Sequence, residues 1–338
     1  QTAEGALTEV HSMLQRMNEL AVQASNGTNS KTDRDAIQSE IDQLTTEIDR
    51  VAETTKFNES YLLKGDADGA TKKMYLEAHD AGLKGKLTDN GDGTATFVMD
   101  DLKAGDGVTI AGKSYTIGAT KDDTDALITA ADGNSHADIV INGTTYKYMA
   151  AQGTGADDSA ANAKEGYYAD GKWTATGDAK SVDDLKTAAK AGSTVEADGK
   201  KLTSLKAADV TAGVSSDDSS VITKANAYVL AANELLAANK IGDTEGNAAV
   251  TDTADAAITL NNGNGTFKIK LAQTEVAEKL NFNLHVGSDA DMTNKINVNI
   301  ETMSSSYLGI KGLNVSDDTG VAATYAVDAI ADALQKVS

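Results

Sequence analysis

The 338-residue sequence predicts an α+β protein with a long α-helical hairpin at its start and a β-rich α+β region in the middle. Over residues 1–53, apolar residues recur at alternating spacings of three and four, which is typical of a helix with one buried face. From about residue 66, short β-prone runs separated by Gly, Asn and Asp replace that pattern. Helical spacing of apolar residues returns over residues 325–338.

Residues 1–53 contain two seams of apolar side chains. The seams are Leu7, Val10, Leu14, Met17, Ala21 and Ala24, and then Ile37, Ile41, Leu44, Ile48 and Val51. Asn26-Gly27 follows the first seam and tolerates the positive φ that often ends a helix, and Thr32 with Asp35 resembles a capping box. We therefore expect two helices joined by a polar connection at residues 27–31.

The seams contain several small side chains, so the hairpin alone would bury too little apolar surface to be stable. A third surface is expected to cover it, and the end of the chain is the candidate. One helical face there is lined by Tyr325, Ala326, Ala329, Ile330, Ala333, Leu334 and Val337. We expect this last helix to pack against the hairpin.

The stretch after the second helix, residues 57–66, is expected to form a short strand or hooked loop anchored by Phe57, Tyr61 and Leu62. Further β-prone runs lie at residues 95–101, 107–118, 137–150 and 259–272. Two of them place hydrophobic arms around an Xaa-Gly pair, Ala111-Gly112 and Asn142-Gly143, which predicts two β-hairpins.

Three further segments, residues 122–133, 181–192 and 219–242, have helix caps and helical spacing. The central region should therefore have its own core. Residues 151–180 are rich in Gly, Ala and Asp and are interpreted as a long loop or a boundary between subdomains at about 67–170 and 171–280.

The composition excludes several classes of site. There is no Cys, so disulfides and thiolate metal sites cannot form. The four histidines, at positions 11, 79, 136 and 285, form no HExxH pattern, and the acidic turn from Thr88 has Met99 where a calcium loop needs its bidentate Glu. We expect a plain hairpin turn at Thr88. For the protein as a whole we expect no bound metal, no cofactor and no enzymatic activity.

The net charge of −21 opposes binding to nucleic acid or to an anionic membrane. No run approaches the roughly 18–20 apolar residues that a membrane span needs. We expect neither nucleic acid nor membrane among the partners.

One face of the first helix is a candidate binding surface. Arg16, Leu20 and Gln23 lie at i, i+4 and i+7, on a different side from Leu14 and Met17. An exposed Leu beside an Arg is a typical interface anchor. The alternative is that Leu20 widens the buried stripe, and the spacing does not distinguish the two.

The run LQRMNELAVQASNGTNS at residues 14–30, followed by IDRVAETTKFN at residues 48–58, closely resembles the amino-terminal rod region of bacterial flagellin. Residues 282–310 resemble the β-hairpin and following turn of the same rod domain, and residues 326–338 resemble the start of its carboxy-terminal helix. The three stretches occur in the order that the family has.

The resemblance implies a structural subunit of the extracellular flagellar filament, which serves motility, with other flagellin subunits as partners. It also implies that a secreted monomer is a ligand for host Toll-like receptor 5 in innate immunity. The family's main receptor contacts match Arg16, Leu20, Gln23 and Glu40. The same face would be buried between subunits in the filament.

The resemblance further implies three parts: rod helices and hook at 1–65, a hypervariable outer domain at 66–280, and the rod β-hairpin with the start of the last helix at 281–338. Many family members place that hairpin before the outer domain. The apolar terminal segments of flagellins do not occur, so we expect a fragment that is monomeric. An alternative function is a surface adhesin whose central domain binds carbohydrate or protein, with the helices as a stalk.

Overall fold

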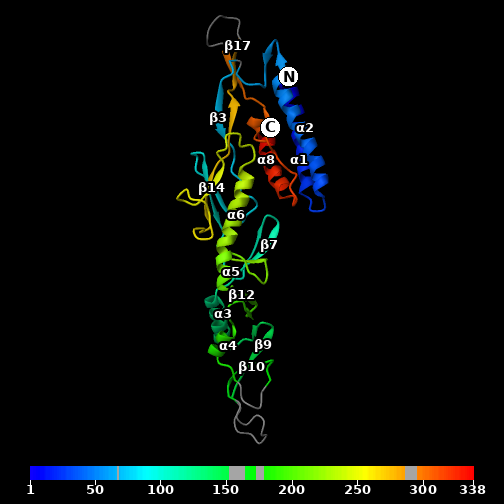
Figure 1. The fold of residues 1–338 in the computed structure, drawn as a ribbon. Coiled ribbons are helices and arrows are strands. Elements are labelled where there is room, and N and C mark those ends of the chain that lie inside the picture. Colours follow the sequence, from blue (N-terminus) through cyan, green and yellow to red (C-terminus); the bar gives the residue numbers. More distant parts are fainter. Residues whose placement is uncertain (67, 152–163, 173–178, 286–294) are drawn as a thin grey trace. The chain divides into compact units, whose positions relative to one another are not determined.

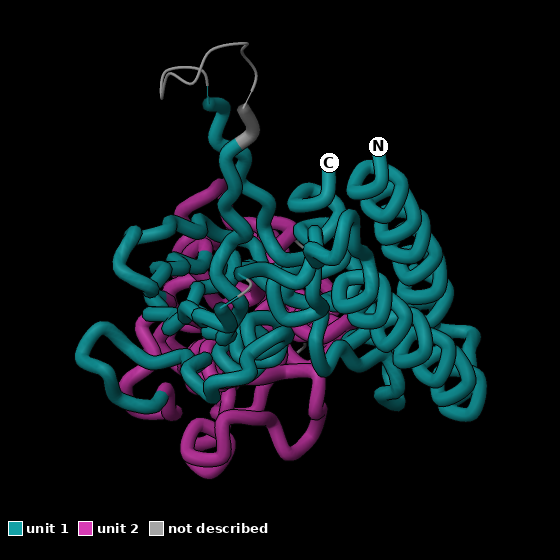
Figure 2. Tube along the Cα trace, turned by 90° about the horizontal axis from the view of Figure 1, so that it is seen from above, with its two compact units in different colours: residues 1–99, 232–257, 266–338 teal, residues 100–231, 258–265 magenta. Residues whose placement is uncertain are grey.

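A computed structural model describes residues 1–66, 68–151, 164–172, 179–285 and 295–338 (Figure 1). The chain forms two compact units, which Figure 2 distinguishes by colour. Unit 1 comprises residues 1–99, 232–257 and 266–338, and unit 2 comprises residues 100–231 and 258–265. Both units contain helices and small sheets, so the α+β prediction is confirmed.

Unit 1 begins with two helices of equal length, α1 (Thr2–Ser25) and α2 (Lys31–Thr54). The capping box that opens α2 consists of Ser30 and Asp33, with the Asp33 amide 3.2 Å from Ser30 Oγ and the Ser30 amide 3.0 Å from Asp33 Oδ2. The predicted box at Thr32 and Asp35 is wrong, because α2 begins before Thr32. Asp35 instead forms an ion pair with Lys31, 2.8 Å away in the first turn.

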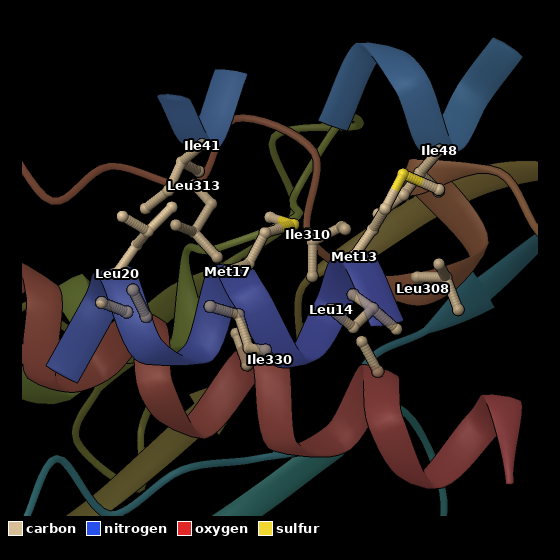
Figure 3. Close-up of a cluster of buried hydrophobic side chains, with 14 of the residues drawn as sticks. Met13, Leu14, Met17, Leu20, Ile41, Ile48, Leu308, Ile310, Leu313 and Ile330 are labelled. Atoms are coloured by element: carbon tan, nitrogen blue, oxygen red, sulfur yellow. The ribbon is translucent and has the colours of Figure 1, made fainter. Parts of the chain in front are cut away.

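A third helix, α8 (Val321–Val337), packs along α1, as the sequence predicts (Figure 1). Val10, Leu14, Met17, Ala21, Ala24, Ile37, Ile41, Ile48 and Val51 are buried in this core, and Leu7 and Leu44 are partly buried against it. The segment 303–315 adds a fourth contributor that the sequence did not predict. Its side chains Leu308, Ile310 and Leu313 lie in the same cluster (Figure 3).

After α2 the chain forms a small hairpin of β1 (Lys56–Phe57) and β2 (Ser60–Tyr61). Its aromatic residues are not anchors: Phe57 is 65% exposed, and Tyr61 is exposed as well. The prediction is wrong for these two residues because the hairpin lies outside the core, but Leu62, the third expected anchor, is partly buried against that core. Leu63 is fully buried, and its carbonyl accepts a hydrogen bond from the Met303 amide at 3.0 Å.

The remaining strands of unit 1 form three sheets. The first is four-stranded, with the order β14 (Ala249–Thr251), β15 (Thr266–Lys270), β5 (Thr94–Met99), β4 (Gly85–Asp89). In the second, β3 (Thr71–Tyr75) pairs with β16 (Gln273–Ala277). In the third, β17 (Leu280–His285) pairs antiparallel with β18 (Lys295–Ile300). The short helix α7 (Ser305–Leu308) follows β18. The run predicted at residues 259–272 is extended only from residue 266.

Unit 2 contains a three-stranded and a five-stranded sheet. The first has the order β13 (Val221–Ile222), β7 (Lys113–Ile117), β6 (Gly107–Ile110); the second has the order β10 (Gly166–Ala169), β9 (Thr144–Met149), β8 (Ile139–Ile141), β11 (Thr194–Ala197), β12 (Lys200–Thr203). Its helices are α3 (Lys121–Gly133), α4 (Val182–Ala188) and α5 (Ala207–Ala212), and α6 (Lys224–Asn239) has residues in both units. Leu127, Ile139, Leu185 and Val195 share a buried core.

Both predicted hairpins of unit 2 are confirmed. Their turns have positive φ at both central residues, 52° and 70° for Ala111-Gly112 and 50° and 85° for Asn142-Gly143, as a tight two-residue hairpin turn requires. The turn between β4 and β5 is also a plain hairpin turn. Its carboxylates Asp89 and Asp92 accept hydrogen bonds from the nearby amides of Gly91 and Thr94, at 2.9 and 3.0 Å.

The long loop predicted at residues 151–180 contains a strand, β10, while residues 152–163 and 173–178 lie outside the described part of the chain. The five-stranded sheet joins strands from both sides of residue 170, which does not agree with a subdomain boundary there. The three-part division at residues 65 and 280 stays a prediction. Unit 1 takes residues from all three of those parts.

Candidate functional site

The predicted binding surface lies on α1 and α2. Arg16 of α1 donates hydrogen bonds from Nε and Nη2 to Glu40 Oε1 of α2, at 2.9 and 2.7 Å. Its Nη1 lies 3.3 Å from Glu19 Oε2, one turn along α1. The structure therefore brings together Arg16 and Glu40, which are separated by 24 residues in the sequence.

The electrostatics of this pair are those of a solvent-exposed site. The hydrogen bond with Glu40, followed by that with Glu19, raises the pKa of the Arg16 guanidinium above its ordinary value. Both donors to Glu40 share one oxygen, and both side chains remain about half exposed. The pair is therefore accessible to a partner, and as an exposed ion pair it contributes little to stability.

Gln23 lies two turns along α1 from Arg16, and its side chain is exposed. Its backbone carbonyl accepts hydrogen bonds from the Asn26 amide, at 3.2 Å, and from the side-chain amide of Asn29. These contacts end α1 and leave the Gln23 side chain available. Val22 beside it is 51% exposed, which is unusual for a large apolar residue in this protein.

Leu20 does not belong to the exposed part of this surface. It is only 2% exposed, and Figure 3 shows it pointing from α1 toward Ile41 and Leu313. The expectation of an exposed anchor is wrong, and the alternative, a wider buried stripe, is what the structure shows. Leu313 belongs to an irregular segment, so no periodic pattern in the sequence announces that it covers this side of α1.

A buried arginine next to the predicted site was missed. Arg34, in the first turn of α2, is 2% exposed. Its Nε donates to the Ala24 carbonyl at 2.9 Å, its Nη2 to the Asn26 carbonyl at 3.2 Å, and its Nη1 to the Asp318 carbonyl at 3.3 Å. The guanidinium thus binds the carbonyls at the end of α1, which otherwise lack intrahelical donors.

A close approach of backbone accompanies this contact. Gly320, at the start of α8, has φ +81°, and a Cβ there would lie 3.0 Å from Arg34 Nη2 and 3.1 Å from the Ala24 carbonyl oxygen. Only glycine allows both the backbone conformation and this approach without strain. Arg34 and Gly320 therefore join the end of α1, the start of α2 and the start of α8.

Two more polar residues of α2 hold the segment at residues 303–315. Gln38 donates from Nε2 to the Leu313 carbonyl at 2.9 Å and accepts at Oε1 from the Val315 amide at 2.6 Å. Asp49 accepts from the backbone amide and the hydroxyl of Ser305, at 2.7 and 2.8 Å. The sequence indicates these contacts only in that Gln38 and Asp49 are hydrogen-bonding residues beside the apolar seam of α2.

The described residues show no sign of metal or membrane chemistry. No group of three or more His, Cys, Asp or Glu side chains among them could hold a metal ion. None of the helices in the described ranges is long and apolar enough to cross a membrane. The side chain of His285 lies outside the described part of the chain.

A profile of the bacterial flagellin N-terminal helical region matches residues 1–68, which contain all four predicted site residues. Flagellin from Clostridium tyrobutyricum is 41% identical over 155 residues, 43% of this chain and 39% of that protein. Flagellin from Salmonella berta is 33% identical over 268 residues, 69% of this chain and 52% of that protein. The chain belongs to the flagellin family.

Flagellin from Salmonella rubislaw is 37% identical over 201 residues, 52% of this chain and 37% of that protein. This flagellin chain therefore spans between about a third and about half of the curated relatives it matches. A solved structure titled FliC from Burkholderia pseudomallei aligns with 100% of this chain and 92% of that chain, at 19% identity and a TM-score of 0.27. That score is too low to show a shared arrangement of the two chains.

Proposed function

We propose that this chain is part of a structural subunit of the bacterial flagellar filament, an extracellular assembly that serves motility. The observation that carries the proposal is the flagellin match over residues 1–68, which form α1, α2 and the hairpin after them. Their core is completed by α8 and by residues 303–315, from the other end of the chain. Such a helical unit needs no cofactor, and other copies of the flagellin would be its partners.

The surface formed by Arg16, Gln23 and Glu40 is the proposed subunit contact. Its polar side chains are at least partly exposed. Arg is among the residues enriched in protein interfaces and their hot spots. Leu20 lies beneath this surface and would support it through packing rather than through contact with a partner.

Polymerisation of the full-length protein tests the filament proposal. We expect the unchanged protein to form filaments in sedimentation and electron microscopy, and Gln23→Arg to reduce them, because a long charged side chain would be inserted into a packed contact. Lys113→Glu, at the start of β7 in unit 2, is the control and should still polymerise. Failure of the unchanged protein would contradict the filament function, and normal filaments from Gln23→Arg would contradict the contact.

We also propose that the free monomer is a ligand for host Toll-like receptor 5 through the same surface. The support is that the structure pairs Arg16 with Glu40 and exposes Gln23, so three of the four side chains of the family's receptor contacts are accessible together. An exposed guanidinium with remaining donors is suited to binding carbonyls or carboxylates of a partner.

Binding of this chain to the purified Toll-like receptor 5 ectodomain checks the second proposal. Arg16→Ala and Gln23→Ala should each weaken binding on the order of tenfold or more, as expected for residues near the centre of an interface. Lys113→Ala, in unit 2, should bind like the unchanged chain. Equal binding by all four proteins would place the receptor contact elsewhere, and loss only in Lys113→Ala would favour the adhesin alternative with its site in the central region.

A further inference from the structure

A partly buried histidine joins three segments of unit 1 that are far apart in the sequence. His79 follows β3, and its Nε2 lies 3.1 Å from Asp332 Oδ2 of α8, with side-chain exposures of 18% and 26%. The buried side chain of Asn239, at the end of α6, binds the backbone of the same histidine. Its Oδ1 accepts from the His79 amide and its Nδ2 donates to the His79 carbonyl, both at 2.8 Å. Side chain and backbone thus both hold His79 in place.

The charged groups around the imidazole are mostly negative. From α8 they are Asp328, Asp332 and Lys336, and from the histidine's own loop they are Glu77 and Asp80, whereas α6 contributes the uncharged Asn239. Burial raises the pKa of Asp328, and burial lowers the pKa of Lys336. Four carboxyl groups therefore accompany a single amine.

These neighbours act on the protonation of His79. Burial opposes a charged imidazole, but the hydrogen bond with Asp332 and the charges of Asp332, Asp328 and Asp80 outweigh it, so the pKa of His79 is raised above 6.5. Protons can reach the ring, because His79 lines an open hollow of about 440 Å³ together with Glu77, Asp332 and Lys336. A cavity of about 20 Å³ beside it has room for roughly one water molecule.

We propose that His79 is a pH-dependent latch that fastens the loop at residues 76–80 to α8 most firmly when its imidazole is protonated. The imidazolium then neutralises part of the negative charge that Asp328, Asp332 and Asp80 concentrate at one place. A neutral imidazole can still donate a hydrogen bond to Asp332, but the carboxylates around it then lack their counter-charge. The loop and α8 are therefore held less firmly above the pKa of the ring.

The sign of the effect on stability follows from linkage. The folded protein binds the proton more tightly than the unfolded chain, whose histidine has a pKa of about 6.5. The extra stability is therefore fully present below about pH 6.5 and is lost as the pH rises through the folded-state pKa. The contact between the loop and α8 therefore changes in strength around neutral pH, where no other common side chain titrates without a large perturbation of its pKa.

Titration of the four histidine rings by NMR tests the latch. His79→Gln assigns the His79 signal, and we expect its pKa in the unchanged protein to lie above 6.5. Asp332→Asn should lower that pKa, because it removes the hydrogen-bonded charge. A His79 pKa at or below 6.5, or one that Asp332→Asn leaves unchanged, would overturn the proposal.

Urea unfolding at about pH 6 and about pH 8.5 gives a second readout. The unfolding equilibrium constant of the unchanged protein should increase more between these pH values than that of His79→Gln, since glutamine retains a hydrogen-bond donor but does not titrate. His11→Gln is the matched control and should behave like the unchanged protein. The same pH dependence in His79→Gln as in the unchanged protein would contradict the latch. If His79→Gln does not fold, through-bond correlations from the His79 backbone assign its ring, and the titrations of the unchanged protein and Asp332→Asn decide.

Discussion

Replacing Arg34 by Met should lower the free energy of unfolding of unit 1 by about 3–5 kcal/mol. Methionine fills much of the space of the arginine stem but offers no donor. The carbonyls of Ala24, Asn26 and Asp318 would then lose their charged partner, and the space around the fully covered guanidinium would hold no donor. The buried Ala24 carbonyl would be left without the hydrogen bond that compensates its desolvation, whereas the Asn26 carbonyl would keep the bond that it accepts from the Asn29 amide at 3.2 Å.

Urea unfolding followed by the helical circular dichroism signal measures this loss. Arg50→Met is the matched control, because Arg50 is an exposed arginine of the same helix whose side chain pairs with Glu47. It should unfold close to the unchanged protein. Arg34→Lys should fall between the two, since lysine keeps the charge but cannot reach three separate carbonyls in the planar geometry of a guanidinium. Equal stability of Arg34→Met and Arg50→Met would show that Arg34 does not join these segments.

Replacing Leu20 by Ala should destabilise the protein by about 2–5 kcal/mol, because it removes buried methyl groups and leaves a cavity between α1, Ile41 and Leu313. Val22→Ala, two residues further along the same helix, should change the free energy of unfolding by no more than about 0.5 kcal/mol, because Val22 is exposed. Thermal or urea unfolding of the two variants side by side checks the difference.

This pair of variants also distinguishes the two interpretations of Leu20. If Leu20 were an exposed anchor, Leu20→Ala would keep the stability of the unchanged protein and would lose affinity for a partner directly. If Leu20→Ala weakens receptor binding, its effect includes the rearrangement of α1, so Gln23→Ala is the cleaner probe of contact. Unchanged stability in Leu20→Ala would mean that the segment around Leu313 does not cover this side of the helix.

Much of the local structure follows from the sequence alone. The helical spacing of apolar residues predicts the buried faces of α1, α2 and α8. The turns at Ala111-Gly112 and Asn142-Gly143 are predicted by an Xaa-Gly pair between two hydrophobic arms, and both central residues of each turn have positive φ. Such signals act over a few residues, so no knowledge of distant contacts is needed. The position of Arg16 on the outer face was likewise predictable from spacing, whereas its partner Glu40 came from the family resemblance.

Only the tertiary structure decided which side chains are exposed and which are buried beside those seams. Residues 303–320 cover Leu20 and bind Arg34, Gln38 and Asp49. The hydrogen bonds from α2 to this segment join residues that are 256 to 284 positions apart, and the segment has little regular pattern of its own. Helical spacing specifies the direction of a side chain on its helix, but burial depends on what else packs there. Because that partner is an irregular segment held through its backbone amides and carbonyls, its place on the helices exists only in the folded protein.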